Sequence, residues 1–420
     1  MNSIEKAIQQ MNNGQVEEAL EILKEYDITA TDDEKFMIAD LYYEWGFLEQ
    51  AIAQLKGLLD AYPQEGQIIT NLAEMYVELE KDDLAIDLLN QIEKKDPFYL
   101  ETLLQLADLY QAQGLFEVSE QKLLEAKQIA PDEKIIDFAL GELLFSIGQY
   151  SRAIPFYEKI VPTFTEINSI VINERLAESY ALTGFYEKAL AYYKELNSEN
   201  PDTLFKYGFT ALQQDRNDIA IHVWKKLIEI DPYYHTVYQE LAYAMKEEGL
   251  IEEAFPVVKQ GLAIDEFNKE LFYLAGELAL LQQEREEAIH YLEEAIALDI
   301  DYQEAILLLV SIYKEEQKHS KIIDVITNVI QDGASDPIYD WELARAYQEE
   351  EMYKEALQSF NKASDHLSHD SDFLKEYGYF LTEEGLISDA IKMLEKYIVH
   401  EPLDEETIAF VERLKFSNTE

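Results

Sequence analysis

Apolar and small residues recur along the chain at the spacing of short amphipathic helices. In the stretch 176–201, Ala177 and Tyr180 share one helical face, and Ala189 and Tyr193 share a second. A glycine stands between the two segments, where it permits a tight turn that a Cβ would hinder. The pattern predicts two short helices that pack against each other as a hairpin.

The small residue at the centre of the second helix returns through the sequence at a nearly constant interval. Most successive spacings are 34 residues, and the exceptions are 32, 36 and 31 residues. Independent domains would not produce this regularity, so twelve consecutive helix hairpins are predicted. In the tenth hairpin Val310 and Ile322 replace small residues, so its two helices should lie further apart. The second-helix column is Ala19, Ala51, Ala85, Ser119, Ala153, Ala189, Ala220, Ala254, Ala288, Ile322, Ala356 and Ala390. The first-helix column is Ala7, Ala39, Ala73, Ala107, Gly141, Ala177, Gly208, Ala242, Gly276, Val310, Ala344 and Gly378.

The hairpin also matches a known repeat. The order Leu-Ala-x-x-Tyr from Leu176, then Gly184, then x-Tyr-x-x-Ala up to Ala189, and finally Tyr, Leu and Pro201 resembles the tetratricopeptide repeat (TPR). The resemblance covers essentially the whole chain. The overall sequence pattern is similar to that of the many-repeat cytosolic members found in Gram-positive bacteria. The resemblance implies an all-α, right-handed superhelical solenoid of about twelve TPR hairpins, whose first helices line a concave groove. Pro201 is expected to end the second helix of its repeat.

The irregular spacings fall between residues 161 and 207, where they predict a longer loop and a joint between two parts. We therefore expect an N-terminal half-solenoid at 1–165 with repeats 1–5 and a C-terminal half-solenoid at 166–402 with repeats 6–12. Residues 403–420 are expected to form a capping helix and tail, which gives the solenoid a polar end.

The charge of the chain narrows the choice of partners. The 420 residues include 34 basic and 85 acidic residues, for a formal net charge of -51. This balance argues against nucleic acids and anionic membranes as partners, because binding either of them requires clustered Lys and Arg. It favours basic partners instead. Cysteine is absent, no apolar run reaches about 18 residues, and the first residues lack a basic segment followed by an apolar stretch. We therefore expect a soluble, cytoplasmic protein.

Catalytic chemistry finds little support in the sequence. Neither a phosphate-binding glycine motif nor an H-E-x-x-H motif occurs. His366 and His369, with Asp365 and Asp370, could in principle hold a metal ion, but a solvated turn between two repeats is the favoured interpretation. No enzyme activity, metal or cofactor is expected.

Directly after the small residue of the first helix, repeats two to six each carry a carboxylate. Side chains four positions earlier and three positions later share that helix face, and many of them are apolar or aromatic. With the groove that the resemblance implies, this predicts a site for a partner-protein segment that carries Lys or Arg and a few hydrophobic anchors. The predicted partner-binding residues are Phe36, Asp40, Tyr43, Glu74, Leu104, Asp108, Phe138, Glu142, Phe145 and Glu178. A solvated acidic face is the alternative interpretation, because one residue in five is acidic (85 of 420).

A second acidic column stands at the start of the second helices. There it complements the helix dipole, so it requires no ligand. Its members are Glu49, Asp83, Glu117, Glu187, Asp218 and Glu252.

After the joint, the first helices become more aromatic and less uniformly acidic. The residues Phe205, Phe209, Tyr243, Tyr273 and Trp341 are predicted to form a secondary surface, either for binding or for self-association. The expected function is a non-enzymatic scaffold or adaptor that binds protein or peptide segments in its groove. Two alternatives stay open, a self-assembling homodimer paired through the aromatic surface and a peptide-sensing regulator.

Overall fold

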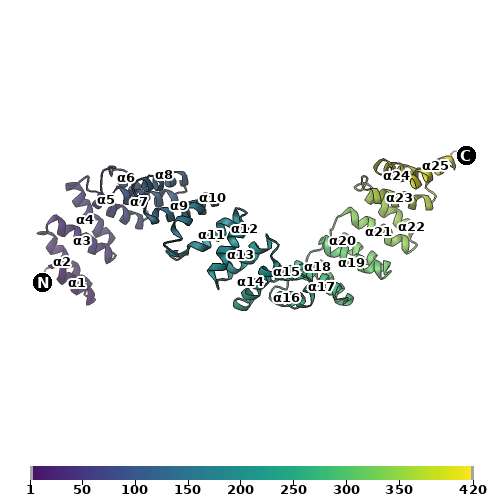
Figure 1. Ribbon diagram of the computed structural model, residues 1–420, viewed down its shortest axis with the longest axis horizontal. Helices are drawn as coiled ribbons and strands as arrows, with labels where there is room; N and C mark the ends of the chain where they lie inside the picture. Colours follow the sequence, from purple (N-terminus) through teal and green to yellow (C-terminus); the bar gives the residue numbers. More distant parts are fainter. Residues whose placement is uncertain (1–2, 418–420) are drawn as a thin grey trace. The chain divides into compact units, whose positions relative to one another are not determined.

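The protein is built from helix hairpins that follow one another along the chain (Figure 1). The computed structural model describes residues 3–417, which form 25 α-helices and a single two-stranded sheet. Twelve hairpins and a last helix are present, which confirms the predicted all-α repeat fold. The chain divides into two compact units between Asn197 and Ser198. This division lies within the irregular stretch 161–207.

The first unit contains six hairpins. Their helices are α1 (Ser3–Asn12) and α2 (Val16–Asp27), α3 (Asp32–Glu44) and α4 (Leu48–Ala61), α5 (Gly66–Glu78) and α6 (Asp82–Leu89), α7 (Tyr99–Ala112) and α8 (Phe116–Ile129), α9 (Lys134–Ser146) and α10 (Tyr150–Ile160), and α11 (Ile172–Leu182) and α12 (Tyr186–Leu196). Between α10 and α11, strand β1 (Glu166–Ile167) pairs antiparallel with β2 (Ile170–Val171). The longer loop expected here therefore contains a short β-hairpin.

The second unit contains the other six hairpins and the last helix. Its helices are α13 (Pro201–Leu212) and α14 (Asn217–Ile230), α15 (Thr236–Glu247) and α16 (Ile251–Ile264), α17 (Lys269–Leu281) and α18 (Arg285–Leu298), α19 (Gln303–Glu315) and α20 (His319–Gln331), α21 (Pro337–Glu349) and α22 (Tyr353–Ser364), α23 (Ser371–Glu383) and α24 (Ile387–His400), and α25 (Glu405–Ser417). Helix α25 buries Thr407 and Val411.

The expectation for Pro201 was wrong. Helix α12 already stops at Leu196, where Asn197 adopts a left-handed conformation with φ 43°. Pro201 instead opens α13 at its first turn, where the missing N–H of proline is not needed and its fixed φ suits the helix. The residue that ends the helix and the proline that starts the next one are therefore separate signals.

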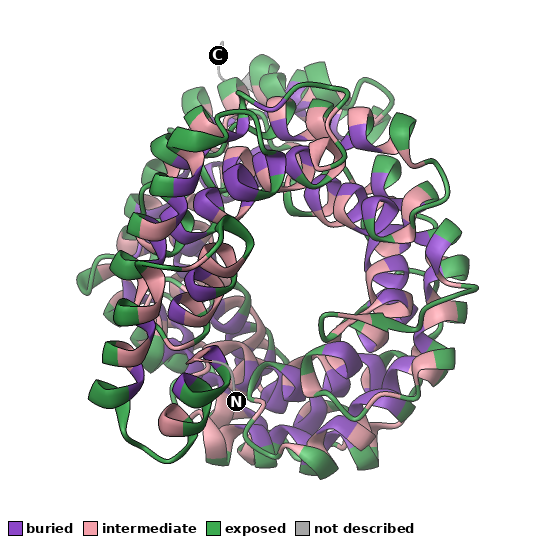
Figure 2. Ribbon diagram, turned by 90° about the vertical axis from the view of Figure 1, so that its left-hand side faces the viewer, coloured by how far each residue is buried: buried purple, intermediate pink, exposed green. Residues whose placement is uncertain are grey.

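Buried side chains lie where the two helices of a hairpin face each other, and the outer turns are exposed (Figure 2). Where the small first-helix residue is glycine, a large side chain sixteen positions later fills the space beside it. Tyr157 lies against Gly141 and Trp224 against Gly208, so that a Cβ built at Gly208 would come within 2.3 Å of Trp224 Nε1. Leucines occupy the same place in the ninth and twelfth hairpins. In the tenth hairpin Val310 and Ile322 are both buried and fill the two positions that are small in most other hairpins.

Every hairpin turn contains one residue with positive φ. Seven of these residues are glycines, including Gly184 with φ +80°. The other five carry side chains in a conformation that costs L-residues roughly 1–2 kcal/mol. They are Glu80, Asp215, Gln283, Gln317 and Glu351.

Candidate protein-binding site

Side chains link the first helices of successive hairpins in the first unit. Asn71 of α5 donates a hydrogen bond from Nδ2 to Oδ1 of Asp40 on α3, at 3.5 Å. One helical turn further along α3, the hydroxyl of Tyr43 donates to Glu78 Oε1 of α5 at 2.5 Å. These contacts join α3 and α5 directly.

Four carboxylates on α3, α5 and α7 form what we call the acidic face, namely Asp40, Glu74, Glu101 and Asp108. Within residues 3–417, no Lys, Arg or His nitrogen lies at ion-pair distance from any of the four. Burial raises the pKa of the Asp40 carboxyl, and it raises the pKa of Glu101 together with the nearby charge of Glu74. Asp108 is open to solvent, yet enough protein surrounds it to raise the pKa of its carboxyl as well. The acidic face is thus an uncompensated concentration of negative charge.

The carboxylates of the fifth and sixth repeats are compensated by a cation of the chain itself. Arg175 of α11 places Nε 3.0 Å from Glu142 Oε1 and Nη1 3.7 Å from Glu178 Oε2. Its guanidinium also lies over the ring of Phe145, 4.5 Å from the centroid. The hydroxyl of Tyr157 donates a further hydrogen bond to Glu142 at 2.5 Å. Glu142 therefore serves a contact between repeats and Glu178 an ion pair within α11, and the acidic face ends before them.

The remaining predicted site residues differ in how far they are buried. Phe36, Tyr43 and Leu104 are half-buried. Phe138, in contrast, is only 7% exposed, because its ring packs into the core, and Glu178 is only 8% exposed. Neither side chain can meet a partner on the surface without rearrangement, so we remove both from the site.

The sequence did not identify Arg175 as a partner of Glu142, although the two residues stand at regular positions of successive repeats. Asn71 and Arg175 stand two residues before the small residue of their helices, whereas Asp40 and Glu142 stand directly after it, one repeat earlier. Residues at these two positions meet across the junction between repeats. Asp108 faces the same position of the next repeat, which is an alanine and offers no donor.

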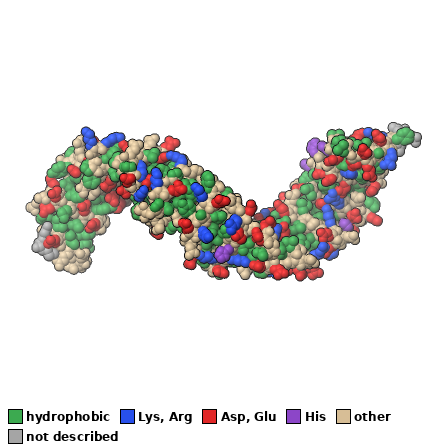
Figure 3. Space-filling view, viewed as in Figure 1, with side chains coloured by type: hydrophobic (Ala, Val, Ile, Leu, Met, Phe, Trp, Pro, Cys, Tyr) green, Lys and Arg blue, Asp and Glu red, His purple; other side chains and the backbone are tan. Residues whose placement is uncertain are grey.

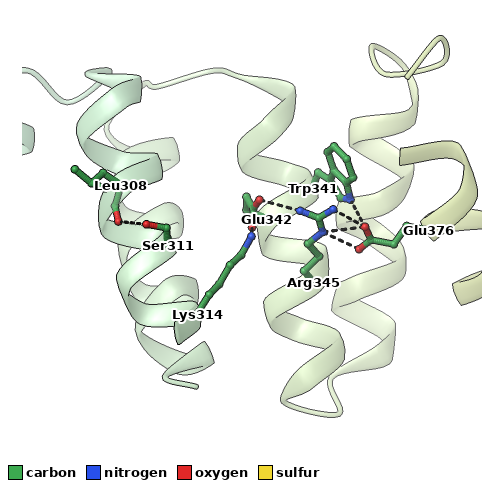
Figure 4. A network of polar contacts seen from close by, with 7 residues as sticks. All are labelled: Leu308, Ser311, Lys314, Trp341, Glu342, Arg345 and Glu376. Carbon is green, nitrogen blue, oxygen red and sulfur yellow. Dashed lines mark hydrogen bonds and ion pairs between the residues drawn. The ribbon is translucent and has the colours of Figure 1, made fainter. Parts of the chain in front are cut away.

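The second unit repeats this junction with its charges exchanged (Figure 4). Arg345 follows the small residue of α21, and its Nε donates to Glu376 Oε1 of α23 at 2.8 Å. The guanidinium lies 4.0 Å from the ring centroid of Trp341, whose Nε1 donates to Glu376 Oε2 at 3.1 Å. Glu342 accepts from Arg345 at 3.0 Å and also binds Lys314 of α19. Trp341, predicted on the secondary surface, is therefore engaged in a network within the chain.

The other predicted aromatic residues of the second unit are also largely engaged. The ring of Phe205 lies 6.1 Å from that of Trp224, and Tyr243 is covered by Lys246 at 5.4 Å from the ring centroid. Tyr273 packs on a neighbouring tyrosine at 5.5 Å between centroids, and burial is the main cause that raises its pKa to about 12. Phe209 is the exposed member of the set, at 48%. Four of the five rings therefore contact other side chains of the chain itself.

Acidic side chains are spread over the visible faces of both units, with Lys and Arg between them (Figure 3). Among the described residues, no group of three or more His, Asp or Glu side chains has the arrangement of a metal site. Across residues 3–417, no helix combines the length and the apolar character needed to span a bilayer.

The solved structures to which this chain is similar include two of different coverage. The crystal structure of YrrB, a TPR protein with an unusual peptide-binding site, is 19% identical and covers 44% of this chain and 96% of its own, with a TM-score of 0.39. The structure of Naa15/Naa10 bound to HypK-THB is 14% identical and covers 92% of this chain and 66% of that chain, with a TM-score of 0.48.

Sequence comparison is more specific. A family model of YpiA-like tetratricopeptide repeats matches residues 111–163, and a second model, of YpiA-like C-terminal tetratricopeptide repeats, matches residues 337–404. General tetratricopeptide-repeat models match residues 36–99 and 270–302. The TPR repeat-containing protein YpiA of Bacillus subtilis (strain 168) is 42% identical over 405 residues, which span 96% of either chain. These matches confirm the resemblance to the many-repeat TPR proteins of Gram-positive bacteria, and the chain belongs to the YpiA-like family of TPR proteins.

Proposed function

We propose that this protein is a non-enzymatic scaffold or adaptor that binds a basic and hydrophobic segment of a partner protein on the acidic face of its first unit. A protein-interaction scaffold is the kind of function that the TPR family supports. The proposal adds where the segment binds and what chemistry it carries.

The observation that carries the proposal is the contrast between two parts of one predicted stripe. At Glu142 and Glu178 the chain supplies Arg175, which satisfies both carboxylates. At Asp40, Glu74 and Asp108, within the part of the chain that the structure describes, it supplies no cation. A Lys or Arg of a partner fits there by charge, as Arg175 fits beside Glu142.

The proposal is tested with a short fluorescent peptide that has Lys at every second position and one central Leu. Its affinity is measured for the wild-type chain and for the variant D40N/E74Q/D108N. The control E49Q/D83N/E117Q removes the same three charges from the exposed second-helix column of the same repeats. Three ion pairs at the protein surface, worth about 0.5 kcal/mol each, predict a loss of roughly tenfold in the first variant. Equal affinities of the two variants would reject the acidic face as the binding site.

A further inference from the structure

A cavity of about 500 Å³ opens at the junction of the second and third hairpins, next to the acidic face. Its residues come from the start of α3, the end of α4 and the start of α5. They include Asp32, Phe36, Met37, Leu58, Tyr62 and Ile68. The cavity therefore lies entirely within the first unit.

The cavity has an apolar interior and an acidic rim. Leu58 and Ile68 are buried beneath it, whereas Met37 and Tyr62 line it with 52% and 45% of their surfaces exposed. The rim carries three carboxylates, and neither Lys nor Arg lines the cavity. One rim carboxylate, that of Asp32, accepts a hydrogen bond from the Tyr62 hydroxyl at 2.6 Å and lies 3.9 Å from Lys35.

Neither exposed apolar side chain recurs at the equivalent position of the two repeats that follow. The first-helix position of Met37 is occupied by asparagine, glutamine and alanine in the next three repeats. The position of Tyr62 is occupied by aspartate and alanine in the next two. Large apolar side chains left open to water forgo burial that is worth about 25 cal/mol per Å². Their concentration around one concave site is typical of a binding pocket.

The pocket is continuous with the acidic face. Phe36 of the pocket stands four residues before Asp40 on α3, and side chains at that spacing are neighbours on one side of a helix. An apolar side chain that enters the pocket would therefore bring the adjacent residues of its own chain close to Asp40.

We infer that this pocket holds a large apolar side chain, such as Leu, Ile, Met or Phe, of a partner segment whose neighbouring Lys or Arg residues bind Asp40 and the pocket rim. The inference rests on the proposed function and specifies its hydrophobic anchor. The acidic rim selects an anchor flanked by basic residues over one flanked by acidic residues. A second copy of this chain is a poor occupant, because its net charge is -51.

The test compares two peptides on the whole chain. One is the Lys peptide with its central Leu, and the other has Ser in place of that Leu. The variant Met37→Gln introduces the residue type found at the equivalent position Gln105, which the fold accepts there. The control Leu124→Gln removes another exposed apolar side chain of the first unit, on α8 and away from the pocket.

We expect Met37→Gln to weaken binding of the Leu peptide about fivefold, to leave the Ser peptide unchanged, and to preserve the salt dependence of both. Leu124→Gln should change neither peptide. If Met37→Gln retains the wild-type preference for Leu over Ser, the pocket inference is overturned, while the proposed function stands as long as D40N/E74Q/D108N still weakens both peptides. If neither peptide binds the wild-type chain, both fail. Should the wild-type chain self-associate and Met37→Gln be monomeric in sedimentation, a second copy occupies the pocket and the inference is overturned.

Discussion

Arg175 of α11 and Glu142 of α9 lie 3.0 Å apart across the junction between the fifth and sixth hairpins. Replacing Arg175 by Gln would remove the cation that lies 3.0 Å from the half-buried Glu142. We expect a loss of about 2 kcal/mol in the free energy of unfolding of the first unit, measured by denaturant titration. The control Arg216→Gln breaks an exposed pair with Asp218 and should leave the free energy of unfolding nearly unchanged.

The same junction allows a sharper experiment, because the second unit places Arg345 and Glu376 at the equivalent positions with opposite polarity. The exchange Glu142→Arg with Arg175→Glu should therefore recover more than half of the stability that the single change Arg175→Glu removes. Failure of the exchange to recover any stability would show that the two junctions are not equivalent. A double-mutant cycle gives this coupling directly.

Two glycine substitutions should change stability in opposite directions. Gly208→Ala would force its Cβ against the indole of Trp224, which donates to the Phe205 carbonyl at 3.2 Å, and should cost about 1–3 kcal/mol. Gly57→Ala lies within α4, where nothing stands within 4 Å of the added Cβ, and should gain about 0.5–1 kcal/mol. Thermal unfolding of the two variants checks both signs. Equal effects would contradict the close packing of the seventh hairpin.

The turns of the hairpins offer a similar pair. Gln317 holds a left-handed conformation with φ 55° between α19 and α20, and Gly114 holds φ +74° at the same place of the fourth hairpin. Gln317→Gly should stabilise the second unit by about 1 kcal/mol, and Gly114→Gln should destabilise the first by a similar amount. Unfolding monitored by tryptophan and tyrosine fluorescence gives both values. Destabilisation by Gln317→Gly would mean that its side chain makes a stabilising contact.

Acidification should act on the acidic face in two ways. Because the pKa values of Asp40 and Asp108 are raised in the folded chain, the folded state holds their protons more tightly than the unfolded state. Stability contributed by these groups should increase as pH falls from 7 through their folded pKa values and be complete below the unfolded value of about 4. Affinity for a Lys peptide should fall over the same range, because the carboxylates lose their charge. D40N/D108N should show a smaller change than wild type in both measurements, and an identical pH dependence would contradict the raised pKa values.

The fold was largely predictable because one position per helix must be small for two helices to approach closely. The columns through Ala189 and Ala177 gave the register of all twelve hairpins. The large side chains that fill the space beside a glycine, such as Trp224 beside Gly208, could not be predicted, because the two residues lie on different helices. The positive φ of Gln317 could not be predicted either, because glutamine, unlike glycine, has no preference for this conformation.

The candidate site was predictable only in part. The sequence placed Asp40, Glu74 and Asp108 on successive first helices, and the structure leaves them without an ion pair within residues 3–417. The sequence alone could not show that the charge of Glu142 is compensated, because its partner Arg175 lies 33 residues away along the chain. The same limit applies to Phe138, whose apolar character suits an anchor and a core residue equally.

The central claim is that a partner's cations bind the acidic face, and the salt dependence of peptide binding tests it most directly. The affinity of the Lys peptide is measured across a series of NaCl concentrations for wild type, for D40N/E74Q/D108N and for E49Q/D83N/E117Q. We expect a steep loss of affinity with salt for wild type and for the second-helix variant, and a clearly shallower slope for the acidic-face variant. Identical slopes for the two variants would show that the peptide responds only to the net charge of the chain, and would contradict the account.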